Sequence, residues 1–373
     1  MRRSGRQMHQ PSQQAILGLP LGTITDTMFE VASVNQVRGV LLEEAILMLL
    51  RASGYRTVTT AAADPTLFEG PAGLNVWGRG GKHQIDAIAD LRIGQPFSNP
   101  QRLLVEAKAY SNERKVGLPV VRGAVGVLKD VSEFWVKGGP DQPAASRYHY
   151  QFAIFSTSEF TRDAQDYAFA QDVHLLPLRG SAFFGPVVRA IEDAVEEIPH
   201  ERGAGVNVDL SDVRYALRER LQPNLQARRG NDFPWLAGVV NATQEVGVSL
   251  IAVLGMAIPV FLTPRRGLDL NALPPNTRVQ IHFGRADPEA SWTITRSDTG
   301  DSIFTFDLPA ELFERYAENG VLTRRAALNL KEEVFGQFTA IYSPQDAIRV
   351  FDFRLDPEWV AQVREDLGRR RRA

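Results

Sequence analysis

Residues 102–109 read RLLVEAKA, an apolar run that ends in a glutamate, an alanine and a lysine. A short apolar run of this kind predicts a strand in the interior of a sheet. Alternate side chains of a strand share a face, so Glu106 and Lys108 point the same way. A carboxylate and an ammonium group are costly to bury unless they have partners. The end of this strand is therefore the first candidate for a functional site.

A second carboxylate lies in the preceding predicted strand, Gln84 to Leu91 (QIDAIADL). If the two strands pair, Asp86 approaches Glu106, and two carboxylates without a cation would repel each other. Mg²⁺ removes this repulsion, because it typically binds one or two carboxylates and keeps several waters. Such an ion eases the attack of water on phosphorus. Lys108 would lie beside the attacking water and orient or deprotonate it.

The composition is that of a globular protein with a sizeable core. A hydrophobic fraction of 44% and a charged fraction of 23% are close to average, and 373 residues favour two domains. The net charge of −2 does not indicate a nucleic-acid partner, yet a nuclease needs only a local basic groove. The absence of cysteine excludes disulfides, thiolate metal sites and a cysteine nucleophile. Any metal must therefore bind oxygen or imidazole ligands, which suits Mg²⁺ or Mn²⁺.

No segment of the sequence predicts export or membrane insertion. The first residues, MRRSGRQMHQPSQQ, lack the apolar centre of a signal peptide. The longest apolar stretch, Val246 to Leu262, is interrupted by polar residues, glycine and proline. It falls short of the ~18–20 apolar residues that a membrane helix needs. We therefore expect a cytoplasmic protein without a membrane partner.

The first half of the chain alternates predicted helices and strands. A helix from Gly39 to Ser53 ends at Gly54, a typical glycine cap. Other predicted elements are strands at 55–58, 74–77, 151–156 and 173–178, and helices at 118–136, 161–171 and within 180–197. This order predicts a mixed α/β sandwich.

The linker candidate PHERGAGVN, residues 199–207, divides the chain into two predicted domains. We expect a disordered tail at 1–15, a first domain at 16–198, a second at 208–367 and a basic tail at 368–373. For the second domain we predict an α+β fold with an antiparallel sheet. Its predicted strands are 249–262, 277–283, 291–296, 303–308, 339–343 and 347–355, and its predicted helices are 310–319 and 357–367.

The pattern Asp86 followed by Glu106-Ala107-Lys108 resembles the PD-(D/E)XK nuclease superfamily, and within it the Mrr-like restriction endonucleases. Four further stretches carry the resemblance: Leu42-Glu43 before Gly54-Tyr55, GGKHQID at 80–86, VEAKAY at 105–110 and FSTSEFT at 155–161. The resemblance covers roughly Gly39 to Leu178, and none is found for the second domain. The sequence departs from the superfamily's name at Ile85, where the name has proline.

The resemblance implies a restriction-endonuclease-like α/β core, a mixed sheet flanked by helices, and a Mg²⁺-dependent endodeoxyribonuclease. It implies that Asp86 and Glu106 bind the metal with the backbone carbonyl of Ala107, and that Lys108 activates or positions the water. The family's first helix also directs an acidic residue at the active site. Counting back from Gly54 favours Glu43 over Glu44 for that role.

Some of these residues also fit a structural role. Glu-x-Lys alone is a weak signal, because Glu113 and Lys115 repeat it in a polar stretch that we interpret as solvated surface. Gln84 shares the face of Asp86 if the strand is continuous. It could then bind a metal water or orient a phosphate, and it fits equally well as a surface amide. Glu43 fits equally well as half of a solvated acidic pair.

We expect DNA as the substrate and, by analogy alone, a role in restriction or phage defence. Two other functions remain open: a catalytically silent nucleic-acid-binding protein on the same fold, and a sensor whose nuclease is gated by a ligand or partner at the second domain. That domain would otherwise select the target or drive oligomerisation. A homodimer or higher oligomer is also open, since nucleases that cut both strands often act as dimers.

Overall fold

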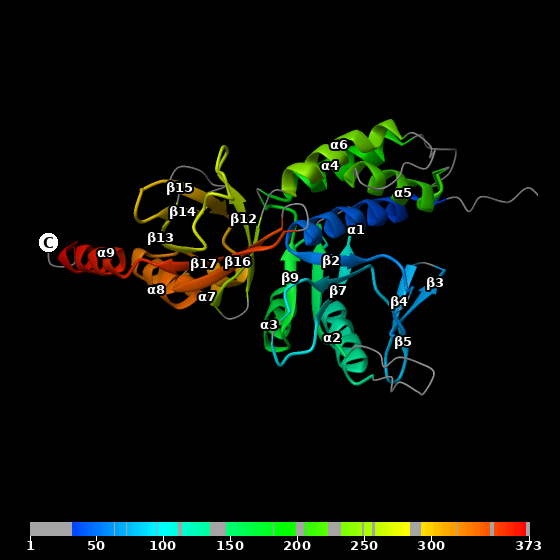
Figure 1. Cartoon of the computed structure of the whole chain (residues 1–373), viewed down its shortest axis with the longest axis horizontal. Coiled ribbons are helices and arrows are strands. Elements are labelled where there is room, and N and C mark those ends of the chain that lie inside the picture. The colour runs from blue at the N-terminus through cyan, green and yellow to red at the C-terminus, as the bar shows by residue number, and fades with distance from the viewer. Residues whose placement is uncertain are drawn as a thin grey trace, which may run out of the picture. The chain divides into compact units, whose positions relative to one another are not determined.

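The structure is a computed structural model of the chain (Figure 1). It describes residues 32–62, 64–71, 73–94, 96–110, 114–134, 147–181, 183–198, 205–206, 208–222, 233–247, 250–255, 258–283, 292–318, 320–343 and 347–370. Several sequence predictions fall outside these ranges: the tail at 1–15, most of the linker at 199–207, Glu113, and the last three residues of the basic tail.

A five-stranded mixed sheet forms the centre of the first part of the chain. Its order is β2-β6-β7-β8-β9. The strands are β2 (Tyr55–Val58), β6 (Ala87–Leu91), β7 (Gln101–Lys108), β8 (His149–Ser156) and β9 (Val173–Pro177). The pairs β2–β6 and β6–β7 are antiparallel, whereas β7–β8 and β8–β9 are parallel. The prediction of a mixed sheet in an α/β core is confirmed.

Helices cover both faces of this sheet (Figure 1). On one face, Leu103 and Val105 of β7 belong to a core shared with α1 (Val34–Ala52) and α4 (Gly185–Glu197). On the other, Leu104 packs in a core with α2 (Leu118–Ser132) and α3 (Arg162–Ala170). Alternate side chains of β7 thus pack in two different hydrophobic cores, which is why the strand is apolar on both faces before Glu106.

Helix α1 has clear signals at both ends. Ser33 and Gln36 form a reciprocal capping box, in which each side chain accepts a hydrogen bond from the other residue's backbone N–H. At the other end Gly54 has a φ of 86°, the left-handed conformation that glycine adopts most easily. These ends fix the helix that presents Glu43 and Glu44.

A small antiparallel sheet lies between α1 and β7 in sequence, with the order β3-β4-β5. Its strands are β3 (Leu67–Gly70), β4 (Gly73–Trp77) and β5 (Lys82–Gln84). The predicted continuous strand Gln84–Leu91 is wrong, because β5 ends at Gln84 and β6 begins at Ala87 in the other sheet. The break occurs where buried Ile85 donates its N–H to the carbonyl of Leu74, at 3.1 Å.

The first hydrophobic core continues past the predicted domain boundary at 198–208. Two helices that the sequence did not predict, α5 (Leu210–Leu221) and α6 (Ala237–Val246), pack on α1 and α4. Their buried side chains, from Val213 to Val246, belong to the same core as those of α1. A short 3₁₀ helix, η1 (Pro234–Leu236), leads into α6, and β1 (Ala32–Ser33) pairs with β10 (Gly205–Val206).

The remaining strands close into a barrel with the order β11-β12-β15-β14-β13-β17-β16. They are β11 (Leu250–Val253), β12 (Pro259–Pro264), β13 (Asn276–Phe283), β14 (Trp292–Arg296), β15 (Ser302–Phe306), β16 (Gln337–Tyr342) and β17 (Arg349–Leu355). The predicted antiparallel sheet is corrected in two respects, because the sheet closes on itself and β13 and β17 run parallel. Closure depends on pairs far apart in sequence, such as β11 with β16, which local alternation does not reveal.

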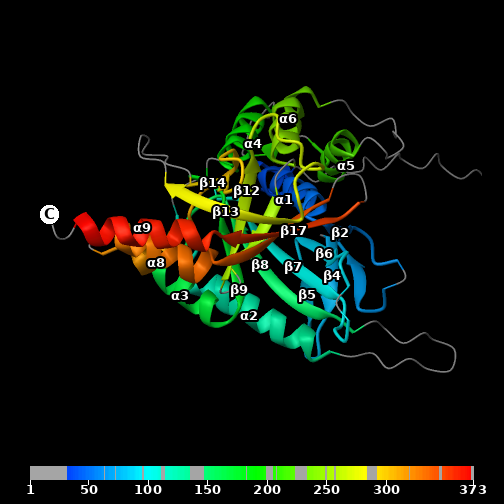
Figure 2. The same ribbon diagram turned by 60° about the vertical axis from the view of Figure 1, so that its left-hand side comes forward.

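Three helices accompany the barrel: α7 (Ala310–Tyr316), α8 (Arg324–Phe335) and α9 (Pro357–Arg370). Figure 2 shows α8 and α9 side by side. Phe335 of α8 contributes a fully buried ring, which packs against Phe306 and Phe338 inside the barrel core. Within the described parts of the chain, none of the helices has the length and apolar character needed to cross a bilayer.

Candidate active site

Asp86 immediately precedes β6, at the end of the β6–β7 ladder formed by Ala87 and Val105. The last ladder pair is Ala87 with Val105, so the same register would set Asp86 opposite Glu106. Oδ2 of Asp86 accepts a hydrogen bond of 2.7 Å from the backbone N–H of Ala107. The side chain of Asp86 thus replaces the missing strand as a partner for β7. The predicted approach of Asp86 and Glu106 is therefore present in the structure.

Glu106 and Lys108 lie on one face of β7 and pair directly through Oε1 and Nζ. Their side chains are each about a quarter exposed, at 26% and 27%. Backbone positions two apart on a strand are separated by about 6–7 Å. The long side chains span this gap themselves, where the sequence had suggested an intervening metal or water. Asp86, Glu106 and Lys108 thus form one charged group at the end of β7.

The surroundings of Asp86 disfavour its charged form. Burial raises the pKa of Asp86 to about 6, and the neighbouring charge of Glu106 acts in the same direction. The N–H of Ala107 and the cations Lys108 and Arg214 oppose this rise. Burial also acts to lower the pKa of Lys108, but its hydrogen bond and charge interaction with Glu106 outweigh it and raise that pKa. Lys108 therefore holds its proton at neutral pH.

Glu43 of α1 belongs to the same electrostatic group. Burial raises the pKa of Glu43 to about 7, Arg214 lowers it, and the charges of Asp86 and Glu44 raise it further. Arg214 of α5 pairs with Oε2 of Glu43 at 2.5 Å. Glu44 is almost fully buried and pairs with Arg218, at 2.7 Å, and with Arg214, at 3.3 Å. The interaction with Asp86 thus belongs to Glu43, and Glu44 joins α1 to α5.

Arg214 is a site residue that the sequence reasoning missed. It lies 171 residues after Glu43, in the stretch assigned to the second domain. A signal was present, because Leu210, Val213, Leu217 and Leu221 recur at helical spacing. Asp209 before them caps the helix by accepting a hydrogen bond from the N–H of Ser211.

The structure does not bring Gln84 together with Asp86 in the predicted way. Gln84 is exposed on β5, where it pairs with Asn75 of β4. Because β5 and β6 belong to different sheets, alternation no longer gives Gln84 and Asp86 a common face. The neighbouring His83 pairs with Asp130 of α2, at 2.8 Å, and thereby ties β5 to that helix.

The donor atoms near Asp86 suit a hard divalent cation. Among the described residues, no group of three or more His, Asp and Glu side chains is arranged to bind a metal. Mg²⁺ does not need three, since one or two carboxylates with waters suffice. Asp86 and Glu106 supply two. A strand residue directs its N–H and C=O to the same neighbour, so the Ala107 carbonyl points to the side of Asp86.

Comparison with known proteins gives one family and two solved structures. Residues 34–180 match the Mrr_cat family model, described as a restriction endonuclease. A search of curated proteins found no match. The crystal structure of AF1548, a protein of unknown function, has 15% identity and a TM-score of 0.30, and the match covers 56% of this chain and 98% of that one.

The second structure is the DNA modification-dependent restriction endonuclease AspBHI, with 17% identity and a TM-score of 0.23. That match covers 39% of this chain and 31% of AspBHI. Both TM-scores are too low to carry an argument about fold or function. The family match confirms the resemblance that the sequence motifs indicated, and it spans Glu43, Asp86, Glu106 and Lys108. Residues 34–180 of this chain form a domain of the Mrr-like restriction endonuclease family.

Proposed function

We propose that this protein is a metal-dependent endonuclease that hydrolyses phosphodiester bonds in DNA. The observation that carries the proposal is the convergence of Asp86, Glu106 and Lys108 at the end of β7, inside the region that matches a restriction endonuclease family. The charge of Glu106 contributes to the raised pKa of Asp86, and a bound cation would relieve this repulsion.

In this proposal Asp86, Glu106 and the Ala107 carbonyl bind Mg²⁺ or Mn²⁺. The bound ion would supply an activated water and stabilise the leaving oxygen. The Ala107–Asp86 hydrogen bond fixes one carboxylate oxygen and leaves Oδ1 to face a ligand. Since Glu106 pairs with Lys108 through Oε1, Oε2 is the oxygen that it offers without breaking that contact.

Lys108 acts as a hydrogen-bond donor in this site. Its pKa is raised, so its ammonium group has no lone pair with which to take a proton from water. The sequence left orienting and deprotonating the water as alternatives, and the charge state favours orienting it. An ammonium group placed here also counters the negative charge that develops on the phosphate.

Glu43 is our candidate for accepting the proton of the attacking water. A carboxyl with a pKa of about 7 is partly ionised at neutral pH, which suits a general base. Arg214 holds this carboxyl by an ion pair and keeps its pKa from rising further. Because Arg214 comes from α5, a residue beyond the family match contributes to the proposed site.

The family match supports a proposal about the wider role. We propose that the protein acts on DNA in the cytoplasm, in restriction or phage defence, and that two copies act together to cut both strands. We also propose that the domain division follows the two hydrophobic cores, with the nuclease part ending near Val246 and the barrel beginning near Leu250. The barrel would select the target or bind a regulator.

Cleavage of supercoiled plasmid tests the nuclease proposal. Wild type and Lys108→Ala are compared with and without Mg²⁺ or Mn²⁺, on plain, methylated and phage DNA. We expect metal-dependent cutting by wild type that is lost in Lys108→Ala. The absence of cutting of all three DNAs by folded wild type would contradict the proposed activity. Equal cutting by both proteins would reject the assigned site.

A further inference from the structure

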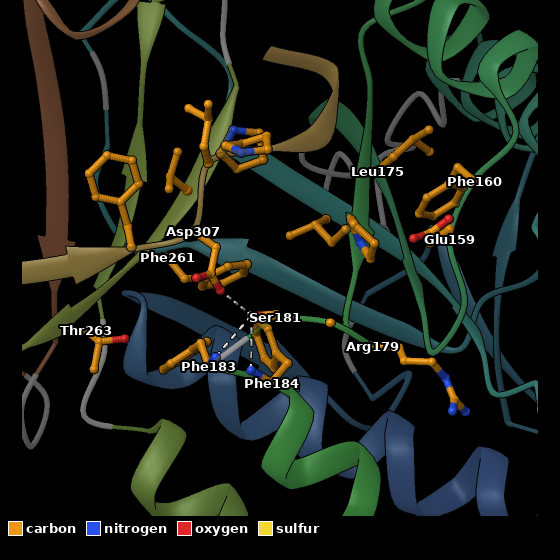
Figure 3. A pocket seen from close by; sticks show the side chains of 18 of the residues that line it. Glu159, Phe160, Leu175, Arg179, Ser181, Phe183, Phe184, Phe261, Thr263 and Asp307 are labelled. Atoms are coloured by element: carbon orange, nitrogen blue, oxygen red, sulfur yellow. Dashed lines mark hydrogen bonds between the residues drawn. The ribbon is translucent and has the colours of Figure 1, made fainter. Parts of the chain in front are cut away.

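A cavity of about 830 Å³ lies apart from the candidate active site. Its walls come from the segment between β9 and α4, from α6, and from barrel strands β12 and β15 (Figure 3). Cavities that bind small organic molecules measure roughly 300–1,000 Å³. Neither the metal-binding candidates nor Lys108 line this cavity, so the proposed DNA cleavage does not account for it.

Three phenylalanine rings form one wall. Phe183 and Phe261 stack with centroids 5.5 Å apart and an interplanar angle of 17°. Phe184 meets both rings edge-on, with centroids 4.6 Å from each. Phe183 and Phe261 are only partly buried, so their rings still offer surface to a molecule in the cavity. This wall favours a ligand with a planar or apolar body.

A carboxylate is held beside these rings. The hydroxyl of Ser181 accepts hydrogen bonds from the backbone N–H groups of Phe183 and Phe184, each at 3.2 Å. The same hydroxyl donates to Oδ2 of Asp307 at 3.1 Å. Figure 3 shows Asp307 and Ser181 next to the three rings. A fixed carboxylate next to aromatic rings is a chemical environment that favours an organic cation.

The charge of the whole lining points the same way. Four carboxylates line the cavity, at Glu159, Glu245, Asp307 and Glu314, against three basic side chains. Those basic groups already pair with carboxylates: Lys115 with Glu159, Arg162 with Asp166, and Arg179 with Glu192. An anionic ligand would therefore have to compete with existing ion pairs. Glu159 is occupied by Lys115 in the same way, but the lining still has one more carboxylate than basic side chains.

We propose that this cavity is a binding site for a small amphipathic organic cation, whose apolar body packs on Phe183 and Phe261 and whose cationic group pairs with Asp307. A chain of hydrogen bonds connects the cavity to the catalytic strand. Arg179 donates to the carbonyl of Thr157 at 2.9 Å, and the N–H of Thr157 donates to the carbonyl of Lys108, also at 2.9 Å. Regulation of cleavage through this connection rests on the proposed function, but the binding does not.

Binding is tested with two fluorescent probes on nucleic-acid-free full-length protein. Thioflavin T is a planar aromatic cation, and 8-anilinonaphthalene-1-sulfonate is an aromatic anion. We expect saturable one-to-one binding of thioflavin T and weaker binding of the anion. Because the readout is fluorescence without DNA, it is independent of nuclease activity, so failure of this proposal and failure of the proposed function are distinguishable.

Three variants locate the bound probe. Asp307→Asn should weaken thioflavin T binding about 5- to 10-fold, the loss of one partly exposed charge pair. Asp301→Asn, on an exposed turn of the same barrel, should bind like wild type. Thr263→Trp should fill the cavity and abolish binding while the melting temperature shows that the barrel is folded. Tighter binding of the anion, or equal binding of thioflavin T by wild type, Asp307→Asn and Thr263→Trp, would overturn the proposal.

Discussion

The backbone N–H of Ala107 donates a 2.7 Å hydrogen bond to Oδ2 of Asp86. Asp86 immediately precedes β6, whose pairing with β7 begins at Ala87, and its side chain extends that pairing by one residue. This contact sets one carboxylate beside Glu106 at a strand end. It makes the position of Asp86 a consequence of the sheet rather than of a flexible loop.

Asp86→Asn tests the charge of this residue separately from its structural contact. Asparagine retains an oxygen that can accept from Ala107, so we expect a melting temperature close to that of wild type. DNA cleavage should fall by about 10²-fold or more, as for loss of one group that stabilises charge in the transition state. The matched control is Asp366→Asn on an exposed face of α9, which should cut like wild type. Loss of activity in both variants would point to a general effect of removing surface charge.

The raised pKa values predict how pH affects the stability of the metal-free protein. Asp86 and Glu43 have pKa values of about 6 and 7 in the folded state, above the ordinary 3.8 and 4.5. At pH values between the ordinary and the folded-state pKa of each group, the folded protein thus binds more protons than the unfolded chain. The stability that these groups contribute is present at low pH and is lost as pH rises through 6 and 7.

The double variant Asp86→Asn/Glu43→Gln measures this loss directly. Its stability relative to wild type should increase between pH 5 and pH 8 by on the order of 4 kcal/mol in the presence of a chelator. Urea unfolding at several pH values gives the difference. Millimolar Mg²⁺ should reduce it, because wild type then gains a stabilising ligand at high pH. A difference that stays constant with pH would contradict the assigned titrations.

Arg214→Gln tests whether α5 contributes to the active site. Arg214 lowers the pKa of both Glu43 and Asp86, so its loss should move the acid limb of the pH–rate profile to higher pH. Cleavage at neutral pH should fall about 10- to 100-fold, as for partners that orient metal ligands. Arg364→Gln, which removes an arginine paired with Glu332 on the barrel, should leave both readouts unchanged. An unshifted profile in Arg214→Gln would assign Arg214 to stability alone.

Arg102 and Arg56 both pair with Asp90, but their burial differs greatly. The side chain of Arg102 is 1% exposed and also pairs with Asp64, whereas that of Arg56 is 73% exposed. Arg102→Leu should destabilise the protein by about 3–5 kcal/mol, because it leaves buried carboxylates without their cation. Arg56→Leu should cost less than about 1 kcal/mol. Thermal or urea unfolding of the two variants measures both losses of stability. Similar losses would show that burial does not determine how much each arginine stabilises the protein.

Much of the nuclease fold could be predicted because its signals are local. The helix ending at Gly54 and the strands β7 and β8 appear in the sequence as apolar patterns of the right length with clear ends. Helices α5, α6 and α8 were missed, although α5 has apolar residues at helical spacing and a capping aspartate. The barrel was missed because β13 pairs with β17 across about 70 residues of chain.

In the candidate site, too, the features with local sequence signals were predictable and those that depend on distant contacts were not. Strand alternation and the resemblance predicted that Asp86, Glu106 and Lys108 lie together, and all three lie at one end of β7 in the structure. The bend at Ile85 and Asp86 was not predictable from alternation, because it depends on a hydrogen bond from Ile85 to Leu74 in another strand. Arg214 could not be placed without knowing that α5 packs on α1.

The most direct measurement for the central claim compares Glu106→Gln with Glu365→Gln in Mg²⁺-dependent cleavage of supercoiled plasmid. Both substitutions remove one glutamate charge, one at the proposed metal site and one on the exposed face of α9. We predict that Glu365→Gln cuts like wild type and that Glu106→Gln, although folded, has lost cleavage. Cleavage by Glu106→Gln at the wild-type rate would contradict the account.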